Sequence, residues 1–251
     1  MMLKGNTDGT LEWSLGNRAL NVSWAMRTDL GRRREINEDS AAATPPIFAV
    51  ADGMGGHDAG EVASACVVER LSELADREVT ESEIVTALRG AVADLVGSGV
   101  DSGSGTTVTG LSLSSAGHMA EIFNIGDSRV YLYRDQAISQ LTVDHSVVQE
   151  LIDSGHISVD EAEVHPHANV ITRAVGFHDD PVPDFIQLTV EPGDRILICT
   201  DGLTKEITTY GLGHFVGLDG GPSVAAEAML EAALENGGRD NITVIVLHID
   251  E

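Results

Sequence analysis

The stretch Thr106–Gln140, with the sequence TTVTGLSLSSAGHMAEIFNIGDSRVYLYRDQAISQ, decides the fold of this chain. Four strand-like runs lie within it, at Thr106–Leu113, His118–Ile125, Val130–Arg134 and Gln136–Gln140. The residues between them, Ser114–Gly117 and Arg134-Asp135, have the composition of tight turns. Strands that follow one another through tight turns pair antiparallel, whereas parallel strands need a long crossover connection. The stretch therefore predicts antiparallel sheets rather than a β-α-β winding.

The segments on both sides of this stretch add further strands and several amphipathic helices. Strand patterns are expected at Asn21–Met26, Pro46–Ala51, Phe185–Val190, Arg195–Thr200 and Ile242–Ile249. Helices are expected at Glu61–Ala75, from a cap at Thr80 or Ser82 to Gly97, and at His145–Ser154, Asp160–Val164 and Ser223–Glu235. Two sheets need their outer faces covered, and the helices are amphipathic enough to do so. We therefore expect an α+β fold, a four-layer α/β/β/α sandwich of two antiparallel sheets flanked by helices.

The length of 251 residues suits one domain with a well-buried core. Residues 1–20 are polar and rich in Gly and Asn, and we interpret them as an N-terminal extension. Residues 21–251 are expected to form a single domain, because they contain no internal repeat and no linker. The sequence ends just after its last apolar run. We expect either a free-standing enzyme or a catalytic domain separated from a longer protein.

The composition limits the partners and the compartment. A formal net charge of −25 repels nucleic acid and anionic membranes, so neither is an expected partner. Cys66 and Cys199 lack C-x-x-C spacing and are expected to be small buried residues in a reducing compartment. The N-terminus has no signal-peptide pattern, and no apolar run approaches the roughly 18 residues of a spanning helix. We expect a soluble cytoplasmic protein.

Five short acidic segments are the candidates for chemistry. They are Asn37–Asp39, Asp52–His57, Gly126–Arg129, Thr200–Gly202 and Arg239–Asn241. Each places a carboxylate beside Gly, Asn or Ser, and oxygen ligands without Cys suit hard cations such as Mg²⁺ or Mn²⁺. A single DG or DN pair is equally typical of an ordinary turn. All five together favour a metal-dependent hydrolase of phosphorylated substrates.

Three of these carboxylates are expected at strand ends. Asp52 follows a buried strand, and Gly53 after it leaves room for its backbone carbonyl to approach a ligand; a plain strand-end turn is the alternative. Asp201 also follows a buried strand, and Asp240 precedes the last one. If the three meet at one edge, their mutual repulsion would force some of them to take up protons. Divalent cations would remove that conflict.

Basic and nucleophilic side chains are the candidates for phosphate binding and proton transfer. The guanidinium of Arg34 is expected to hold a phosphate bidentately, whereas Arg32 and Arg33 are interpreted as a solvated basic run. His57 is either a general acid for the leaving alkoxide or a structural hydrogen-bond donor. The loop that contains His57 lacks the Walker lysine, and neither cysteine has the C-x5-R setting of a cysteine phosphatase.

The segments resemble the motifs of the type 2C metal-dependent serine/threonine protein phosphatases in their bacterial form. The resemblance covers Thr28 to about His248. The matching segments read TDLGRRREINEDS, VADGMGGHDAGEVAS, GSGTTVTG, NIGDSRVYLYR, LTVDHSVVQELIDSGHI, HPHANVITRAVG, PGDRILICTDGLTKEI and GGRDNITVIVL. The family has the α/β/β/α fold, and the resemblance adds a flap subdomain at about residues 144–180, which borders the active site and affects substrate choice.

The resemblance also implies roles for individual residues. Asp52 is similar to the ligand that bridges two metals, with Gly53 giving a carbonyl oxygen, while Asp201 and Asp240 resemble the remaining ligands of the first metal and Glu38 resembles a ligand of the second. The resemblance implies that Asp39 supports the cluster and that Asn241 orients its neighbour. Arg34 resembles the phosphate-binding arginine, and Asp127 with Asp201 resembles a third, weaker metal site. The implied cofactors are two Mg²⁺ or Mn²⁺ ions about 3.5–4 Å apart that activate a water.

The function that follows is hydrolysis of phosphoserine and phosphothreonine in proteins, without a covalent phosphoenzyme. The expected partners are phosphorylated protein substrates and a cognate serine/threonine kinase system, and the chain is expected to be a monomer. The alternative is a non-catalytic phospho-switch or scaffold on the same fold. A two-metal nuclease is disfavoured by the net charge of −25 and the lack of a basic stripe.

Overall fold

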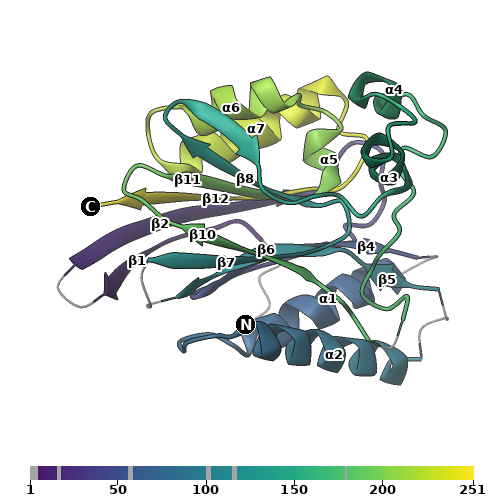
Figure 1. The fold of residues 1–251 in the computed structure, drawn as a ribbon, viewed down its shortest axis with the longest axis horizontal. Coiled ribbons are helices and arrows are strands. Elements are labelled where there is room, and N and C mark those ends of the chain that lie inside the picture. Colours follow the sequence, from purple (N-terminus) through teal and green to yellow (C-terminus); the bar gives the residue numbers. More distant parts are fainter. Residues whose placement is uncertain (1–4, 16–17, 56–58, 100–102, 115–117, 179) are drawn as a thin grey trace.

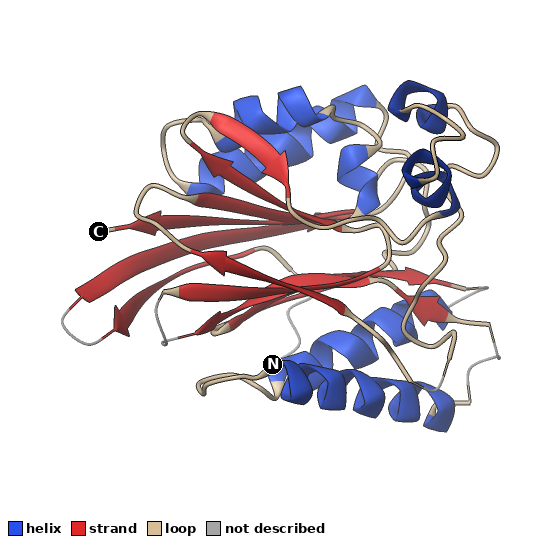
Figure 2. Cartoon of the chain, in the orientation of Figure 1, coloured by secondary structure: helices blue, strands red, loops and turns tan. Residues whose placement is uncertain are grey.

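The computed structural model describes residues 5–15, 18–55, 59–99, 103–114, 118–178 and 180–251. The described elements form four layers, in which two antiparallel sheets lie between helices (Figure 1; Figure 2). The first sheet has the order β1 (Thr7–Leu15), β2 (Arg18–Asp29), β12 (Ile242–Asp250), β11 (Arg195–Cys199), β8 (Arg129–Arg134) and β9 (Ala137–Gln140). The second has the order β10 (Asp184–Thr189), β7 (Met119–Ile125), β6 (Val108–Ser114), β4 (Ile47–Met54) and β3 (Asp39–Thr44), and β5 (Gly105–Thr106) pairs with β4. The predicted α/β/β/α sandwich is confirmed.

Helices cover both outer faces. The second sheet is covered by α1 (Ala59–Ser72) and α2 (Glu81–Gly97), and the first by α5 (Asp201–Thr204), α6 (Thr209–Val216) and α7 (Pro222–Asn236). The segment predicted as the flap contains α3 (Val147–Asp153) and α4 (Val159–Glu163), and a bridge between Thr106 and Val175 ties it to β5. Among the described helices, none is both long and apolar enough to cross a membrane.

The alternation of side chains along the strands divides the apolar residues among three cores. In β4, Phe48 and Val50 enter the core between the sheets, while Ala49 and Ala51 face α1 and α2. The last strand, β12, divides its apolar residues in the same way between the inter-sheet core and the core under α5–α7. Near-continuous apolar runs are therefore required, because both faces of these strands are buried.

The N-terminal segment differs from the prediction. We expected residues 1–20 to be an extension, but β1 pairs with β2 along all nine of its residues. Trp13 of β1 is buried in the inter-sheet core, and its ring lies 5.5 Å from that of His118, which directly precedes β7 in the second sheet. The residues of β1 are therefore part of the first sheet. Its polar composition reflects the outward-facing residues of an edge strand.

Five loop or strand-end positions reach one end of the sandwich, on the right in Figure 1. Asp39 at the start of β3 is paired with Asp52 near the end of β4. The chain crosses from the second sheet to the first between β7 and β8, and Asp127 lies on that crossing. The start of α5 and the start of β12 lie at the same end, which brings Asp201 and Asp240 there as well.

Candidate metal centre

The backbone around α5 explains why Asp201 and Asp240 come together. Thr200 occupies the N-cap position of α5, and its N–H donates to the carbonyl of Thr243 in β12 over 3.0 Å. Gly202, the second residue of α5, lies against Asn241 so closely that an added Cβ would be 1.9 Å from the Asn241 carbonyl oxygen. Only glycine permits this approach.

Asp39 is the most buried of the predicted ligands, with 4% of its surface exposed. The hydroxyls of Thr200 and Thr243 donate to its Oδ2 atom over 2.9 and 2.7 Å. Its Oδ1 atom is buried and has no hydrogen-bond partner within the described residues. The pKa of Asp39 is raised to about 7, chiefly by burial and also by the charges of Asp201 and Asp240, while the two hydroxyls act to lower it.

Asp52 lies on a backbone that is held on both sides. Its N–H donates to Thr107 Oγ1 over 3.0 Å, and its carbonyl accepts from Thr107 N–H and from Thr106 Oγ1, each over 2.9 Å. Burial raises the pKa of Asp52 well above its usual range, and neighbouring carboxylates raise it further; these are Asp39, Asp201, Asp127 and Asp240. The five carboxylates therefore act as one electrostatic unit.

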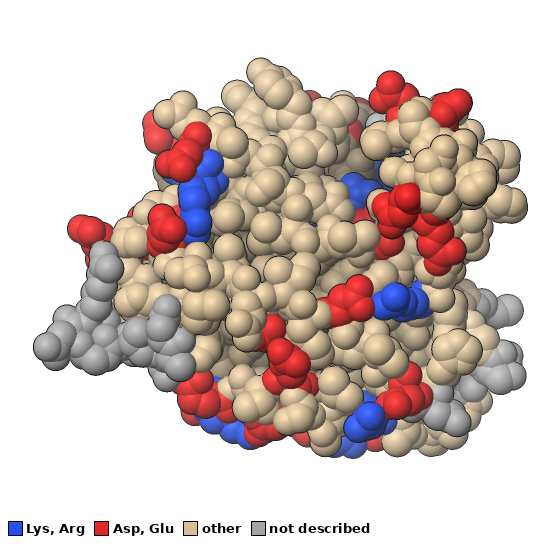
Figure 3. Space-filling model, in the orientation of Figure 1, with Lys and Arg blue, Asp and Glu red and all other residues tan. Residues whose placement is uncertain are grey.

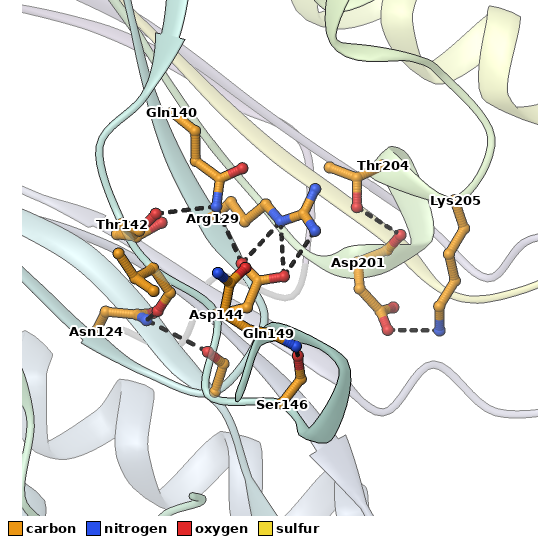
Figure 4. Close-up of polar contacts among 12 residues, drawn as sticks. Asn124, Arg129, Gln140, Thr142, Asp144, Ser146, Gln149, Asp201, Thr204 and Lys205 are labelled. Carbon is orange, nitrogen blue, oxygen red and sulfur yellow. Dashed lines mark hydrogen bonds and ion pairs between the residues drawn. The ribbon is translucent and has the colours of Figure 1, made fainter. Parts of the chain in front are cut away.

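Asp127 joins this unit from the crossing between the sheets. Burial raises its pKa to about 7, and the charges of Asp201 and Asp144 add to the effect, while Lys205 opposes it. Asp144 is itself paired with Arg129, over 2.6 Å between Arg129 Nη2 and Asp144 Oδ2 (Figure 4). That pair fixes the beginning of the predicted flap beside β8.

Two cationic side chains contact the acidic cluster. Arg34 Nη2 lies 2.7 Å from Asp240 Oδ1, and Arg34 Nη1 lies 3.8 Å from Glu38 Oε2. Lys205 Nζ lies 2.5 Å from Asp201 Oδ2 and 3.5 Å from Asp240 Oδ2. Figure 4 shows the lysine ammonium pointing at the Asp201 carboxylate. Both cations compensate part of the repulsion among the carboxylates.

The side-chain amide of Asn241 organises the segment that carries Arg34 and Glu38. Its Oδ1 atom accepts from the Glu38 N–H over 2.9 Å, and its Nδ2 donates to the carbonyls of Leu30 and Ile36 over 2.9 and 3.0 Å. A single amide thus closes the loop between β2 and β3. This satisfies three backbone groups at once.

The residues fit hard divalent cations, although the carboxylates are not arranged as a ready ligand set. No group of three His, Cys, Asp or Glu side chains among the described residues is arranged to hold an ion, and the acids engage Arg34 and Lys205 instead. However, Asp39 Oδ1 and Asp201 Oδ1 are buried without hydrogen-bond partners in the described structure. Gly53 lies so close to Glu38 and Gly60 that a Cβ would be 2.6 and 2.1 Å from their carbonyl oxygens. An all-oxygen donor set with spare buried lone pairs suits Mg²⁺ or Mn²⁺.

The structure brings most of the predicted site residues to one place. The five aspartates lie close enough to repel one another. The other predicted residues, Arg34, Glu38, Gly53 and Asn241, either contact these aspartates or each other, or directly adjoin one of the aspartates in the chain. His57 lies outside the described residues. The prediction missed Lys205, because its spacing of four residues from Asp201 is a signal only on a helix, and the short helix α5 was not predicted. It also missed the hydroxyls of Thr107, Thr200 and Thr243, which lie inside the quoted motifs but carry no signal of their own.

Comparison with known proteins identifies the relationship that this geometry suggests. The family described as protein phosphatase 2C matches residues 32–218. The chain belongs to the protein phosphatase 2C family. This confirms the family that the motifs resemble.

Bacterial relatives share most of the chain. The serine/threonine protein phosphatase PstP of Mycobacterium tuberculosis is 38% identical over 92% of this chain, which spans only 45% of that relative's length. The serine/threonine phosphatase stp of Listeria monocytogenes is 35% identical over 90% of this chain and 95% of its own length. A crystal structure of the PstP catalytic domain in complex with two manganese ions superposes with a TM-score of 0.83 at 35% identity, covering 92% of this chain and all of that one.

Proposed function

We propose that this chain is a metal-dependent protein phosphatase that hydrolyses phosphoserine and phosphothreonine in proteins. The observation that carries the proposal is the convergence of Asp39, Asp52, Asp127, Asp201 and Asp240 at one end of the sandwich, where burial and mutual repulsion raise the pKa values of three of them. An acidic cluster of this kind is stable as a set of carboxylates only with cations among them. The membership in the protein phosphatase 2C family points to the same activity.

We propose that Asp52, Asp201 and Asp240 would hold one core ion, that Asp52 and Glu38 would hold the second, and that the Gly53 carbonyl would add an oxygen ligand. Asp127 and Asp201 would hold a third. Bound there, Mg²⁺ or Mn²⁺ would supply Lewis acidity and lower the pKa of a water that attacks phosphorus. Asp39 supports the cluster as a buried carboxylate that accepts hydrogen bonds from Thr200 and Thr243.

Arg34 is proposed to bind the phosphoryl group. Its side chain is 45% exposed, so it reaches the acidic cluster on one side and solvent on the other. Its guanidinium carries several donors, and the contact with Asp240 occupies only part of them. A phosphoryl oxygen pair would take the free edge bidentately, which neutralises charge as the phosphorus–oxygen bond breaks. His57 keeps the two roles expected from the sequence, general acid or structural hydrogen-bond donor.

The proposed partners are phosphorylated proteins and a cognate serine/threonine kinase system, and the proposed state is a cytoplasmic monomer with one catalytic domain. Cys66 and Cys199 are free thiols, which suits a reducing compartment. The net charge of −25 opposes nucleic acid binding. On the face drawn in Figure 3, Lys and Arg side chains are dispersed among Asp and Glu rather than gathered in a stripe.

The test is turnover of p-nitrophenyl phosphate and of a phosphothreonine peptide with and without Mn²⁺. We expect Mn²⁺-dependent release of phosphate by the wild type and loss of at least about a hundredfold in kcat/KM for Asp52→Asn and Asp201→Asn. Lack of turnover together with tight binding of the phosphopeptide by the wild type would instead establish the phospho-switch or scaffold alternative. Activity that survives both substitutions would remove the metal centre from the mechanism.

A further inference from the structure

Lys205 brings a fixed positive charge into the acidic cluster. It directly follows α5, four residues after Asp201, and the geometry of one helical turn directs its side chain back along the helix. Its ammonium lies 2.5 Å from Asp201 Oδ2 and 3.5 Å from Asp240 Oδ2. Both are carboxylates of the proposed metal centre.

The backbone that carries Lys205 is locked in place. Arg239 Nη2 donates to the Lys205 carbonyl over 3.1 Å, and Arg239 Nε donates to Glu206 Oε1 over 2.9 Å. The Glu206 side chain is only 1% exposed, although that of Arg239 is 66% exposed, so one end of this anchor is shielded from solvent. Lys205 therefore differs from a freely moving surface lysine.

The environment of the pair makes the contact with Asp201 effective. The Asp201 side chain is 14% exposed and that of Lys205 is 34% exposed, so solvent screens their attraction less than it screens a surface pair. The charge of Lys205 also lowers the pKa of Asp127, which places the ammonium within electrostatic reach of that carboxylate. Asp127 and Asp201 are the two side chains proposed for the third ion.

We propose that Lys205 is a positioning residue that acts as a tethered counter-cation and competes with a divalent ion at the Asp127–Asp201 position. The ammonium lies 2.5 Å from Asp201 Oδ2, so it repels a divalent ion bound to the same carboxylate and takes up part of that carboxylate's charge. Lys205 thus weakens the third ion in this chain. The inference rests on the proposed metal centre.

The experiment compares Mn²⁺ binding by the wild type, Lys205→Met and Lys205→Arg, without substrate. Methionine keeps most of the side-chain volume and removes the charge, whereas arginine keeps the charge and is the matched control. Calorimetric titration of metal-free protein, with electron paramagnetic resonance to count free Mn²⁺, gives the number of bound ions and the Kd of the weakest site. We expect that Kd to fall about tenfold or more in Lys205→Met and to stay within about twofold of the wild type in Lys205→Arg.

A double variant locates the effect. Adding Asp127→Asn to Lys205→Met should return the weakest Kd to the wild-type value or raise it, because the carboxylate that gains the ion is removed. In EDTA, Lys205→Met should unfold at a lower temperature than the wild type, because the carboxylates lose a counter-charge. Mn²⁺ should then raise the Tm of Lys205→Met by more than it raises the Tm of the wild type.

Different results overturn different claims. Equal weak-site Kd values in the wild type and Lys205→Met, with Mn²⁺ bound by both, would remove the counter-cation role and leave the metal centre intact. A gain that persists in the Asp127→Asn background would place the competition elsewhere. A wild type that binds no Mn²⁺ would overturn the metal centre and this inference together.

Discussion

Arg34 illustrates how one side chain serves two charged partners. In this structure its guanidinium contacts Asp240 and Glu38. A lysine at this position keeps the charge but presents a point charge rather than a planar fork. We expect Arg34→Lys to lower kcat/KM on a phosphothreonine peptide by about tenfold to a hundredfold. Most of the loss should be a higher KM, because lysine cannot make the bidentate phosphate contact.

Arg33 supplies the matched control for that experiment. It is the exposed neighbour in the same basic run. Arg33→Lys should leave kcat/KM within about twofold of the wild type, since an exposed and screened charge is retained. If both lysine variants lose activity equally, the geometry of the Arg34 guanidinium has no special role within the basic run.

Thr243 tests the support of Asp39. Its hydroxyl donates to Asp39 Oδ2 over 2.7 Å in a fully buried setting. Thr243→Val keeps the shape and removes that donor, which leaves the carboxylate less well solvated. We expect the unfolding free energy in urea to fall by about 1–3 kcal/mol, and the Mn²⁺ Kd to rise. Unchanged Mn²⁺ binding in the folded variant would show that Asp39 does not support the cluster.

At the scale of elements, the sequence predicted those strands and helices that carry bulky apolar residues at a regular period. The last strand, Ile242–Asp250, and the helix Glu81–Gly97 were predicted within a residue or two. By contrast, β3 has the sequence DSAAAT and was missed, because small residues give no hydrophobic signal although five of the six are buried. The four-residue helix α5 was missed because so short a helix depends on its tertiary contacts.

The start of α5 depends on the contact between Gly202 and Asn241. A Cβ at Gly202 would meet the Asn241 carbonyl oxygen at 1.9 Å, so the helix would have to move away from β12. We expect Gly202→Ala to lower the unfolding free energy by more than about 2 kcal/mol and to weaken Mn²⁺ binding, because Asp201 moves with the helix. Chemical denaturation and calorimetry measure the two effects.

Gly97 provides the control for this substitution. It ends α2, and nothing lies within 4 Å of an added Cβ. Gly97→Ala should therefore be neutral or stabilising by up to about 1 kcal/mol, since alanine is the better helix former. A Gly202→Ala variant that matches Gly97→Ala in stability and Mn²⁺ binding would contradict the role given to the close approach.

The strand β1 tests whether the N-terminal segment belongs to the domain. Trp13 is 6% exposed and lies in the core between the sheets. Trp13→Ala should lower the unfolding free energy by about 3 kcal/mol, as expected for loss of a buried indole. Thr10→Ser, at an exposed position of the same strand, should change it by less than about 0.5 kcal/mol. An equally small effect at Trp13 would restore the interpretation of residues 1–20 as an extension.

At the scale of the whole molecule, the sequence predicted that acidic residues far apart in the chain would meet, but not how their charge is balanced. Strand-end positions located Asp52, Asp201 and Asp240, since their strands could be recognised. The pairing of Lys205 with Asp201 and of Arg34 with Asp240 depends on side-chain directions that only the packed structure defines. A net charge of −25 gave no hint that cations would sit inside the cluster.

The raised pKa values make the stability of the metal-free protein depend on pH. Asp39 and Asp127 have a pKa of about 7 in the folded chain, against a usual value of 3.8. Between pH 6 and 8 the unfolded chain holds no proton on these groups, whereas the folded chain releases its protons. The folded state thus binds more protons, so the unfolding free energy falls as pH rises. His248 opposes this trend near pH 6, because burial lowers its pKa in the folded chain to about 4, whereas its imidazole in the unfolded chain, with a usual pKa of 6.5, still binds a proton there.

We expect the two carboxyls to lower the unfolding free energy in EDTA by about 3 kcal/mol from pH 6 to pH 8, at about 1.4 kcal/mol each, and His248 to offset a little under about 1 kcal/mol of that loss. Asp127→Asn should remove about half of that loss, because an amide does not titrate. Saturating Mn²⁺ should abolish or reverse the loss, since cations stabilise the ionised cluster and bind better as its protons leave. Urea denaturation at the two pH values measures all three changes in unfolding free energy. A pH profile that is flat in EDTA, or the same with and without Mn²⁺, would mean that these carboxylates do not share the repulsion on which the proposed metal centre depends.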